Sequence, residues 1–416
     1  MHNHIKSRPL PVVFFTLFVN ALGFSILIPI IPLLLADPQS PFYLLTNGLT
    51  LQTGYIILGF LTGIFAIMQF FATPILGQLS DKYGRKPLLL FSLFGTFVAY
   101  VVFAIAIYLR NIPLLFISRA FDGITGGNIS VAQAAIADIT TPEKRARNFG
   151  LIGAAFGLGF ILGPYLGGKL SDPTLVSWFN ATTPFWVAAL LSLLNVLFVE
   201  FFFEETHQHM RTDLVINWSK SLLNIMHAYT FKNMRVVFLS VFLFYSAFTF
   251  FTTFFSVYLI HRFQFSQGNI GDFFAYVGLW SVFAQAVIIR RVHGKFGEAS
   301  ILRVTLFASG FSVLLYLFPT IWWQMIFIVP FFSIFSGLST VGLTSLISRS
   351  TDPSQQGEIL GISASIQALA QGIPPILAGF IAASLSPESP IIIAIVTFIA
   401  AGIVFMFYHP RKPTIA

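Results

Sequence analysis

The chain has 416 residues, of which 56% are hydrophobic and 9% are charged, whereas a soluble domain carries roughly a quarter charged residues. This composition excludes an ordinary water-soluble globular protein. The net charge of +8 would suggest nucleic-acid binding in a soluble protein. The positions of the basic residues along the chain therefore decide how this charge is interpreted. The sequence contains no cysteine, which excludes disulfides, thiolate metal sites and cysteine nucleophiles.

Hydrophobic runs of about twenty residues, the length that crosses a bilayer as a helix, recur through the chain. The first follows Lys6 and Arg8, as a signal peptide would, but it lacks a small-residue cleavage site and is predicted to be retained. The runs lack the two-residue alternation of barrel strands. The sequence therefore predicts an all-α membrane protein with twelve transmembrane helices. The predicted spans are residues 11–35, 54–78, 87–109, 113–138, 147–170, 183–203, 236–260, 270–290, 299–318, 322–348, 357–381 and 389–408.

Basic residues gather on one side of these spans. Only Arg110, Lys169 and Arg262 fall in or beside odd-numbered joints, and Arg119 lies within a span. The other 19 of the 23 Lys and Arg residues lie at the termini or by even-numbered joints. The positive-inside rule then places both termini in the cytoplasm. Orientation in a membrane explains the basic character, and we expect no nucleic-acid partner.

The longest polar interval, residues 204–235, divides the spans six and six. We therefore expect an N-terminal six-helix bundle at residues 1–203, a cytoplasmic central linker at residues 204–235 and a C-terminal six-helix bundle at residues 236–416. Within the linker, hydrophobic residues from Leu214 to Met226 alternate with polar ones, which indicates a helix on the membrane surface. A flexible linker is the alternative.

The two halves of the chain resemble each other in sequence. Parallel repeats of this kind are related by an axis along the membrane normal, with the substrate site near the midplane between them. The sequence thus predicts two pseudo-symmetric bundles. Shifts of 211 and 213 positions superpose glycines, prolines and one joint without gaps: Gly150 on Gly361, Pro164 on Pro375, Gly168 on Gly379, and Lys82-Tyr83-Gly84 on Lys295-Phe296-Gly297.

The segment from Gly77 to Lys86 reads GQLSDKYGRK and is the most specific short motif. It resembles the cytoplasmic signature GxLxDxxGRK of the major facilitator superfamily. The resemblance implies that Gly77 permits close helix approach and that Gly84 makes a tight turn. It also implies that Asp81 lies near Arg85 and the positive N-terminal end of a second-half helix. In that family the joint latches the two halves in one state; an ordinary basic loop is the alternative.

The fifth predicted span carries a glycine face, because Gly159, Gly163 and Gly167 recur at four-residue steps. Together with Pro164 and Gly168 they are similar to the GxxxGPxxGG signature of the proton-coupled antiporter branches of the superfamily. Small residues at this spacing also let helices pack closely. Plain packing without a meaning for antiport is the alternative.

Residues 119–168 closely resemble the tetracycline efflux proteins and their multidrug relatives, through GITG at 123–126, IAD at 136–138 and FGLG at 156–159. In those proteins acids stand at the positions of Asn20 and Ala99, and a small neutral residue usually stands at that of Asp122. These departures argue against tetracycline as the substrate. They indicate that the titratable carboxylate has moved from the first span to the fourth. The second half matches weakly.

Two charges lie deep within a predicted span. Arg119 and Asp122 are about 9 and 14 Å into the fourth span, and their i, i+3 spacing places them on adjoining faces. Asn20 reaches about 14 Å in the first span, so we expect the three residues to meet. A charge within a span costs about 2.5 to 3.5 kcal/mol on insertion scales, which makes the pair a candidate for proton coupling. A structural pair that joins two helices is the alternative.

Polar residues deep in several spans are candidate substrate-binding groups. Gln69 is carried over from the tetracycline efflux pattern. A buried amide in a membrane bundle more often joins helices than binds a ligand, so each residue is ambiguous alone. The full set of candidates is Asn20, Gln69, Gln133, Tyr245, Gln285 and Gln371.

We interpret the chain as a secondary transporter, a proton-coupled antiporter that exports a small amphipathic or hydrophobic organic compound. In this cycle Asp122 exchanges a proton for substrate while Arg119 stabilises its charged form. The alternative is uptake or facilitated diffusion of a nutrient or metabolite, such as a siderophore or a sugar-like solute. A receptor or channel on the same scaffold is a third class.

The expected partners are the small-molecule substrate, protons and the lipid bilayer. Phosphate-cradling and hydrolase motifs are missing from the sequence, so we expect no enzyme activity, no cofactor and no bound metal. The chain is expected to act as a monomer in a bacterial cytoplasmic (inner) membrane.

Overall fold

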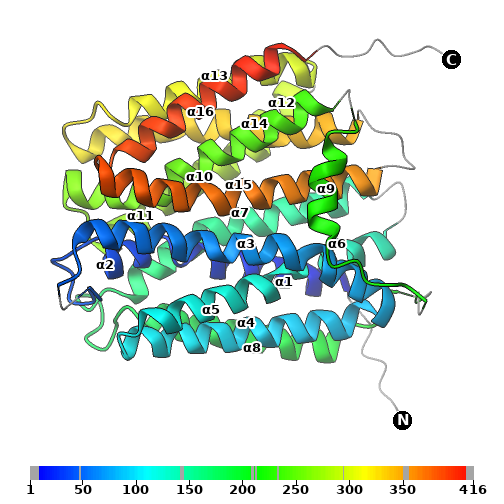
Figure 1. The fold of residues 1–416 in the computed structure, drawn as a ribbon, viewed down its shortest axis with the longest axis horizontal. Coiled ribbons are helices and arrows are strands. Elements are labelled where there is room, and N and C mark those ends of the chain that lie inside the picture. The colour runs from blue at the N-terminus through cyan, green and yellow to red at the C-terminus, as the bar shows by residue number, and fades with distance from the viewer. Residues whose placement is uncertain are drawn as a thin grey trace.

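The computed structural model describes residues 9–45, 48–140, 145–207, 210, 213–231, 234–293, 295–349 and 356–408. Long helices run side by side along its longest axis (Figure 1). Their bounds are α1 Pro9–Ser25, α2 Ile30–Leu35, α3 Leu51–Tyr83, α4 Arg85–Tyr108, α5 Ile112–Thr125, η1 Gly126–Asn128, α6 Ile129–Asp138, α7 Arg145–Leu170, α8 Thr183–Phe202, α9 Lys220–Ala228, α10 Arg235–Phe263, α11 Gln267–Phe283, η3 Ala284–Ile289, α12 Arg290–His293, α13 Glu298–Leu315, η4 Trp322–Phe327, α14 Val329–Arg349, α15 Gln356–Ser384 and α16 Ser389–Met406.

Eleven helical segments of the described residues are long and hydrophobic enough to cross a membrane. The all-α membrane fold is thereby confirmed. The predicted fourth span is not one of these eleven segments, because it consists of α5, η1 and α6 in succession. Its 3₁₀ turn contains Gly126 and Gly127, and glycine costs about 1 kcal/mol in a helix interior. The span is therefore present without being one continuous helix.

The first span is also interrupted. Between α1 and α2 the chain makes a short turn in which the Ile28 nitrogen bonds to the Ser25 oxygen at 3.1 Å. Pro29 stands directly before α2 and Pro32 lies within it. Because proline has no N–H to donate, the regular helical ladder cannot run unbroken through this stretch.

Helices from opposite halves of the sequence cross at glycines. A Cβ atom on Gly59 of α3 would lie 3.1 Å from the Cα atom of Gly379 on α15. A Cβ atom on Gly168 of α7 would lie 3.0 Å from the Cα atom of Gly271 on α11. Gly168 and Gly379 are the two residues that the 211-residue shift superposes. The same position of the repeat thus supplies both crossings, and only glycine allows the backbones to come so close.

The helix α9 lies across the long helices near one end of the molecule (Figure 1). Its Ser221 Oγ donates to the Phe70 oxygen of α3 at 2.7 Å, and its Asn224 Nδ2 donates to Ser365 Oγ of α15 at 3.1 Å. The apolar residues around Leu214, which the sequence pattern included in a surface helix, lie outside it. The division of the chain at residues 203 and 236 stays a prediction.

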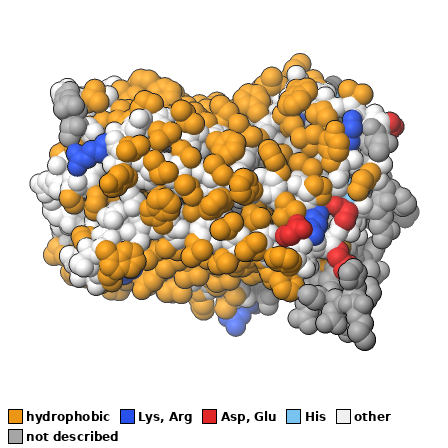
Figure 2. Space-filling model, turned by 90° about the horizontal axis from the view of Figure 1, so that it is seen from below, with side chains coloured by type: hydrophobic (Ala, Val, Ile, Leu, Met, Phe, Trp, Pro, Cys, Tyr) orange, Lys and Arg blue, Asp and Glu red, His pale blue; other side chains and the backbone are white. Residues whose placement is uncertain are grey.

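The outer surface has the character of a membrane protein. Figure 2 shows a face covered mainly by hydrophobic side chains, with its acidic groups gathered at one end. We name the two ends of the molecule after residues at them. The Gly84 end is where α3 passes into α4, and the Lys169 end is where α7 terminates.

Candidate functional site

Arg119 and Asp122 form a buried ion pair one turn apart on α5. Arg119 Nη1 lies 2.8 Å from Asp122 Oδ2, and the two side chains are 3% and 5% exposed. Burial raises the energetic cost of both charges, and the short contact offsets it only while both partners remain. The pair is therefore held together by its surroundings as well as by its charge.

Side chains of α3 and α4 enclose this pair. The Arg119 guanidinium carbon lies 4.3 Å from the centre of the Phe65 ring of α3, a cation–π contact. On α4, Thr96 shares a hydrogen bond of 3.2 Å with Thr125 of α5. Arg119 Nε has no hydrogen-bond partner among the described residues. The pair lies within the first half, shut off from solvent in this state.

Asn20 does not join the ion pair, contrary to the expectation that the three residues meet. Its Nδ2 donates instead to Oδ1 of Asn128 in η1 at 2.7 Å. Gln69 of α3 donates to the oxygen of Gly126, also in η1, at 3.0 Å. The break in the fourth span is the reason, because a 3₁₀ turn presents its polar groups in directions that a regular helix would not.

A glycine of α1 links the surroundings of Asn20 to those of the ion pair. Gly23 lies one turn from Asn20, and a Cβ atom there would fall 1.9 Å from the Tyr100 hydroxyl of α4. Tyr100 is itself buried and lies within electrostatic range of Asp122 and Arg119. The Tyr100 ring thus fills the space between the ion pair and α1. Apart from the glycine itself, nothing in the local sequence predicts this contact between distant helices.

The other predicted substrate-binding residues are spread over both halves. Gln133 on α6 and Gln285 in η3 are exposed, whereas Gln371 on α15 and Tyr245 on α10 are partly buried. Gln285 Oε1 lies 4.0 Å from where a Cβ of Gly153 on α7 would stand, so it faces the opposite half. Within the described residues, no hydrogen bond joins these four to Asn20 or Gln69.

The joint between α3 and α4 is a network centred on Arg85, whose side chain is 6% exposed. Arg85 lies 2.7 Å from Asp81 and, through Nε, 3.0 Å from Asp138 of α6. Lys86 Nζ donates to the backbone carbonyl oxygen of Glu200 on α8 at 2.7 Å. Gly84 has a φ of +100°, which favours glycine. The turn expected at this position is therefore present.

Two details of the joint differ from what the family resemblance implied. A Cβ on Gly77 would meet Ser130 Oγ only at 3.5 Å, an ordinary contact, so this glycine makes no unusually close helix approach. Asp81 pairs with Arg85 of its own half, and no described contact links it to a second-half helix. Its neighbour Lys82 donates through Nζ to the backbone oxygen of Leu214 at 3.1 Å.

Glu205 completes the joint and was missed from the sequence. Its carboxylate accepts from the backbone nitrogens of Arg85 at 2.9 Å, Lys86 at 3.0 Å and His207 at 2.9 Å. Burial works to raise the pKa of Glu205, but these backbone donors outweigh it and hold the pKa below its ordinary value. Glu205 thus neutralises the N-terminus of α4, a role favoured by the helix dipole.

The glycine face of α7 packs against α1. Cβ atoms on Gly159 and Gly163 would fall within 3 Å of α1 atoms, and one on Gly167 would fall 2.4 Å from the Ile26 oxygen in the turn that follows α1. Ser25 Oγ of α1 also donates to the Gly159 oxygen at 2.9 Å. On the neighbouring face, the Pro164 oxygen lies 2.8 Å from where a Cβ of Gly271 would stand. This segment therefore joins α1 on one side and the second half on another.

Two polar contacts join the halves at the Lys169 end. Lys169 Nζ lies 2.8 Å from Asp272 Oδ2 on α11. The Tyr55 hydroxyl of α3 lies 3.0 Å from His261 Nε2 on α10. The sequence showed each residue only near a span end, because a contact between distant helices leaves no local pattern.

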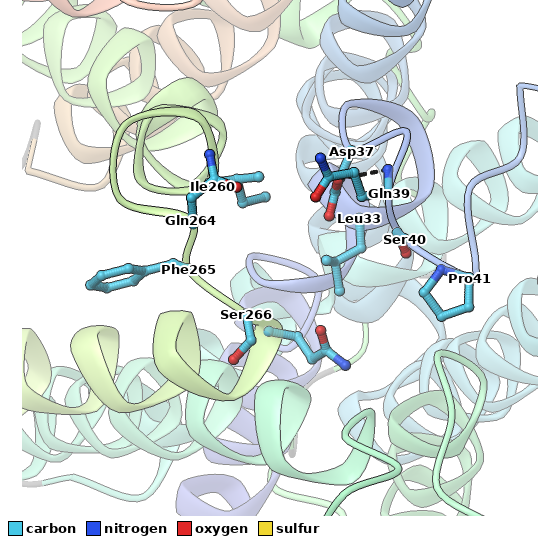
Figure 3. A pocket seen from close by; sticks show the side chains of 10 residues that line it. Leu33, Asp37, Gln39, Ser40, Pro41, Ile260, Gln264, Phe265 and Ser266 are labelled. Carbon is cyan, nitrogen blue, oxygen red and sulfur yellow. Dashed lines mark hydrogen bonds between the residues drawn. The ribbon is translucent and has the colours of Figure 1, made fainter.

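A small cavity of about 240 Å³ lies at the same end, between the 37–41 turn and residues 264–267. Figure 3 shows Asp37 accepting from the Gln39 nitrogen at its edge. None of the predicted substrate-binding residues lines it. Clusters of three or more His, Cys, Asp or Glu side chains able to hold a metal are likewise missing from the described residues.

Comparisons with known proteins assign the family. The family model described as Major Facilitator Superfamily matches residues 13–308 and 237–415. The tetracycline resistance protein of class H from Pasteurella multocida is 30% identical over 87% of this chain and 86% of its own. Major facilitator superfamily domain-containing protein 10 of Mus musculus is 28% identical over 90% of this chain and 87% of its own.

A solved structure agrees at the level of the fold. The crystal structure of the human organic anion transporter MFSD10 (TETRAN) matches with a TM-score of 0.72 and 24% identity, covering 95% of this chain and 98% of that one. Members of this family are transporters rather than enzymes, and the sequence relatives include tetracycline efflux proteins. The protein is therefore a multi-pass membrane transporter that belongs to the Major Facilitator Superfamily.

Proposed function

We propose that the protein is a proton-coupled antiporter that exports a small amphipathic or hydrophobic organic compound. The observation that carries this proposal is the ion pair of Arg119 and Asp122, buried near the middle of the stretch formed by α5, η1 and α6. Ionisable residues inside a membrane span are costly and typically serve ion or substrate pathways. The other acidic side chains of the described spans lie near helix ends, including Asp81, Asp138 and Asp272.

The burial of the pair requires a change of conformation before a proton can reach it. Asp122 is closed off by α3 and α4, while Asn20 and Gln69 lie on neighbouring α1 and α3. A substrate that binds Asn20 competes with its bond to Asn128 and shifts α1. That movement loosens the contact between Gly23 and Tyr100, which then opens a route to Asp122. Protonation of Asp122 weakens its attraction to Arg119 and completes the exchange.

The substrate is proposed to differ from tetracycline. The tetracycline resistance relatives resemble this chain over most of its length, but Asn20 and Ala99 stand where that family carries acids. The similar structure of the human organic anion transporter MFSD10 widens the range of candidate compounds. A transport screen therefore begins with amphipathic anions, cations and neutral compounds in equal number.

The Gly84 end is proposed to face the cytoplasm of a bacterium, with both termini on that side. Described basic residues there include Lys82, Arg85, Lys86, Lys220 and Arg235, whereas Arg110, Lys169 and Arg262 lie at the other end. This asymmetry follows the positive-inside rule. Reporter fusions that locate Lys220 outside the cytoplasm would overturn the orientation.

The decisive test replaces Asp122 by asparagine, which keeps the shape and removes the titratable group. In proteoliposomes with an imposed pH gradient, Asp122→Asn should abolish uphill transport and substrate-induced proton release while downhill exchange persists. Asp172→Asn, a change in the turn after α7, is the matched control and should behave as the wild type. Wild-type uphill transport and proton release in Asp122→Asn would show that the pair is structural and would refute the proposal.

A further inference from the structure

A groove of about 490 Å³ opens between the two halves near the Gly84 end, and its lining exposes no polar surface. It lies where α9 crosses α3 and α15 (Figure 1). Each of the three helices contributes hydrophobic side chains to it, among them Phe71 of α3, Leu222 of α9 and Ile373 of α15. These three are 40%, 51% and 38% exposed, so the groove opens on the outer surface of the bundle.

The groove lies beside the close crossing of α3 and α15. A Cβ atom on Gly63 would fall 2.5 Å from the Gly372 oxygen, so the two backbones touch there. Beyond that contact, Phe70 and Phe71 stand on one side and Leu369 on the other. The helix α9 spans the opening, held by the bonds from Ser221 and Asn224 to the two halves.

We propose that this groove is a binding site for one acyl chain of a phospholipid from the bilayer leaflet at the Gly84 end. Sites for small solutes carry a few polar groups that fix orientation and give specificity. This groove has none, so it is suited to a hydrocarbon chain and cannot discriminate among polar compounds. Burial of each methylene group contributes about 0.8 kcal/mol, which makes a long chain a favourable occupant.

The residues around α9 suit the headgroup of such a lipid. Lys220 begins the helix, and the flanking Trp218 and Tyr229 are 69% and 72% exposed. Tryptophan and tyrosine favour the level of the headgroups, and lysine attracts anionic ones. An acyl chain in the groove then contacts α3, α9 and α15 together. It stabilises the arrangement in which α9 bridges the two halves.

Photolabelling of the full-length protein tests this proposal. The probe is phosphatidylglycerol with a diazirine in one acyl chain, mixed into vesicles of phosphatidylethanolamine and phosphatidylglycerol. Label should concentrate on residues 67–71, 222–226 and 369–373, compared with Leu190 of α8 and Val396 of α16, which are 55% and 59% exposed. Label spread evenly over these sites would identify ordinary surrounding lipid and overturn the proposal.

Two variants fill the groove from different helices. Ile373→Trp and Leu222→Trp should each lower labelling of the groove about tenfold, equivalent to about 1.4 kcal/mol. Ile392→Trp, on the exposed face of α16, is the matched control and should leave it unchanged. Unchanged labelling in both groove variants contradicts the proposal. Displacement of the label by an excess of a transported compound also contradicts it, since the groove would then be a solute site.

Discussion

The joint that connects α3 to α4 recurs between α12 and α13, but the two copies are built differently. In the first half Gly84 has a φ of +100° and a Cβ there would fall 2.5 Å from Glu205 Oε2. In the second half Gly297 has a φ of −69°, and a Cβ there would meet nothing within 4 Å. The first copy is thus a tightly packed network, and the second is an open turn.

The same contrast holds inside the membrane. The shift of 211 residues lays Arg119 and Asp122 on Pro330 and Ser333. Ser333 Oγ only donates to the Val277 oxygen at 3.3 Å. The repeat therefore preserves helix crossings, as at Gly168 and Gly379. The buried ion pair of Arg119 and Asp122, in contrast, has no counterpart at the matching positions of the second half.

Removing Arg119 should cause the largest loss of stability. Arg119→Ala leaves the Asp122 carboxylate buried without its partner, which costs about 3 to 5 kcal/mol. Ser333→Ala in the other half removes a single neutral hydrogen bond and should cost about 1 kcal/mol. Thermal unfolding of the purified variants measures both. An equal loss of stability in Arg119→Ala and Ser333→Ala would show that the buried ion pair contributes no more than a neutral hydrogen bond.

Substituting the two joint glycines should have the next largest effect. Gly84→Ala places a side chain in a left-handed conformation and against Glu205, with an expected cost of about 1 to 2 kcal/mol. Gly297→Ala meets open space at an ordinary φ and should stabilise by about 0.4 to 1 kcal/mol through the unfolded state. Changes of opposite sign in the unfolding temperatures of the two variants would confirm that the two joints are packed differently. A similar loss of stability in both variants would show that they are not.

Hydrophobic run length predicted most of the fold. The predicted fifth span at 147–170 corresponds to α7 at Arg145–Leu170, and the sixth ends one residue from the end of α8. Run length cannot show how the backbone proceeds within a span. The breaks before Pro29 and at Gly126 therefore emerged only from the structure, where the turn at Gly126 redirects Gln69 and Asn128.

The candidate site was predictable only where it is local in sequence. The contact of Arg119 with Asp122 follows from their i, i+3 spacing on one helix. The bond of Asn20 to Asn128 and the bridge of Tyr55 to His261 depend on how separate helices are rotated against each other. A single sequence carries no record of that rotation, so these partners were missed.

Neutralising Asp81 should change transport more than stability. Its side chain is 37% exposed, and an exposed ion pair contributes about 0 to 1 kcal/mol. Asp81→Asn releases one of the two acids on Arg85 and should slow transport severalfold with little change in thermal unfolding. Glu298→Gln, at the second-half position that the 213-residue shift lays on Arg85, should slow it less. Equal rates for wild type and Asp81→Asn would make the joint an ordinary loop.

The smallest expected effect concerns the pH dependence contributed by Glu205. Its backbone donors hold the folded-state pKa below the ordinary value of 4.5, so the group stabilises the fold above that value. This contribution is lost as the pH falls through the lower, folded-state pKa. Glu205→Gln should therefore lower the unfolding temperature at neutral pH, and the difference from wild type should shrink under acid conditions. Glu204→Gln is the matched control, because it removes the same charge from the exposed neighbouring residue. A gap between wild type and Glu205→Gln that stays constant from neutral to acid pH would mean that the carboxylate acts by shape and not by charge, and the difference between the two joints would then be one of packing alone.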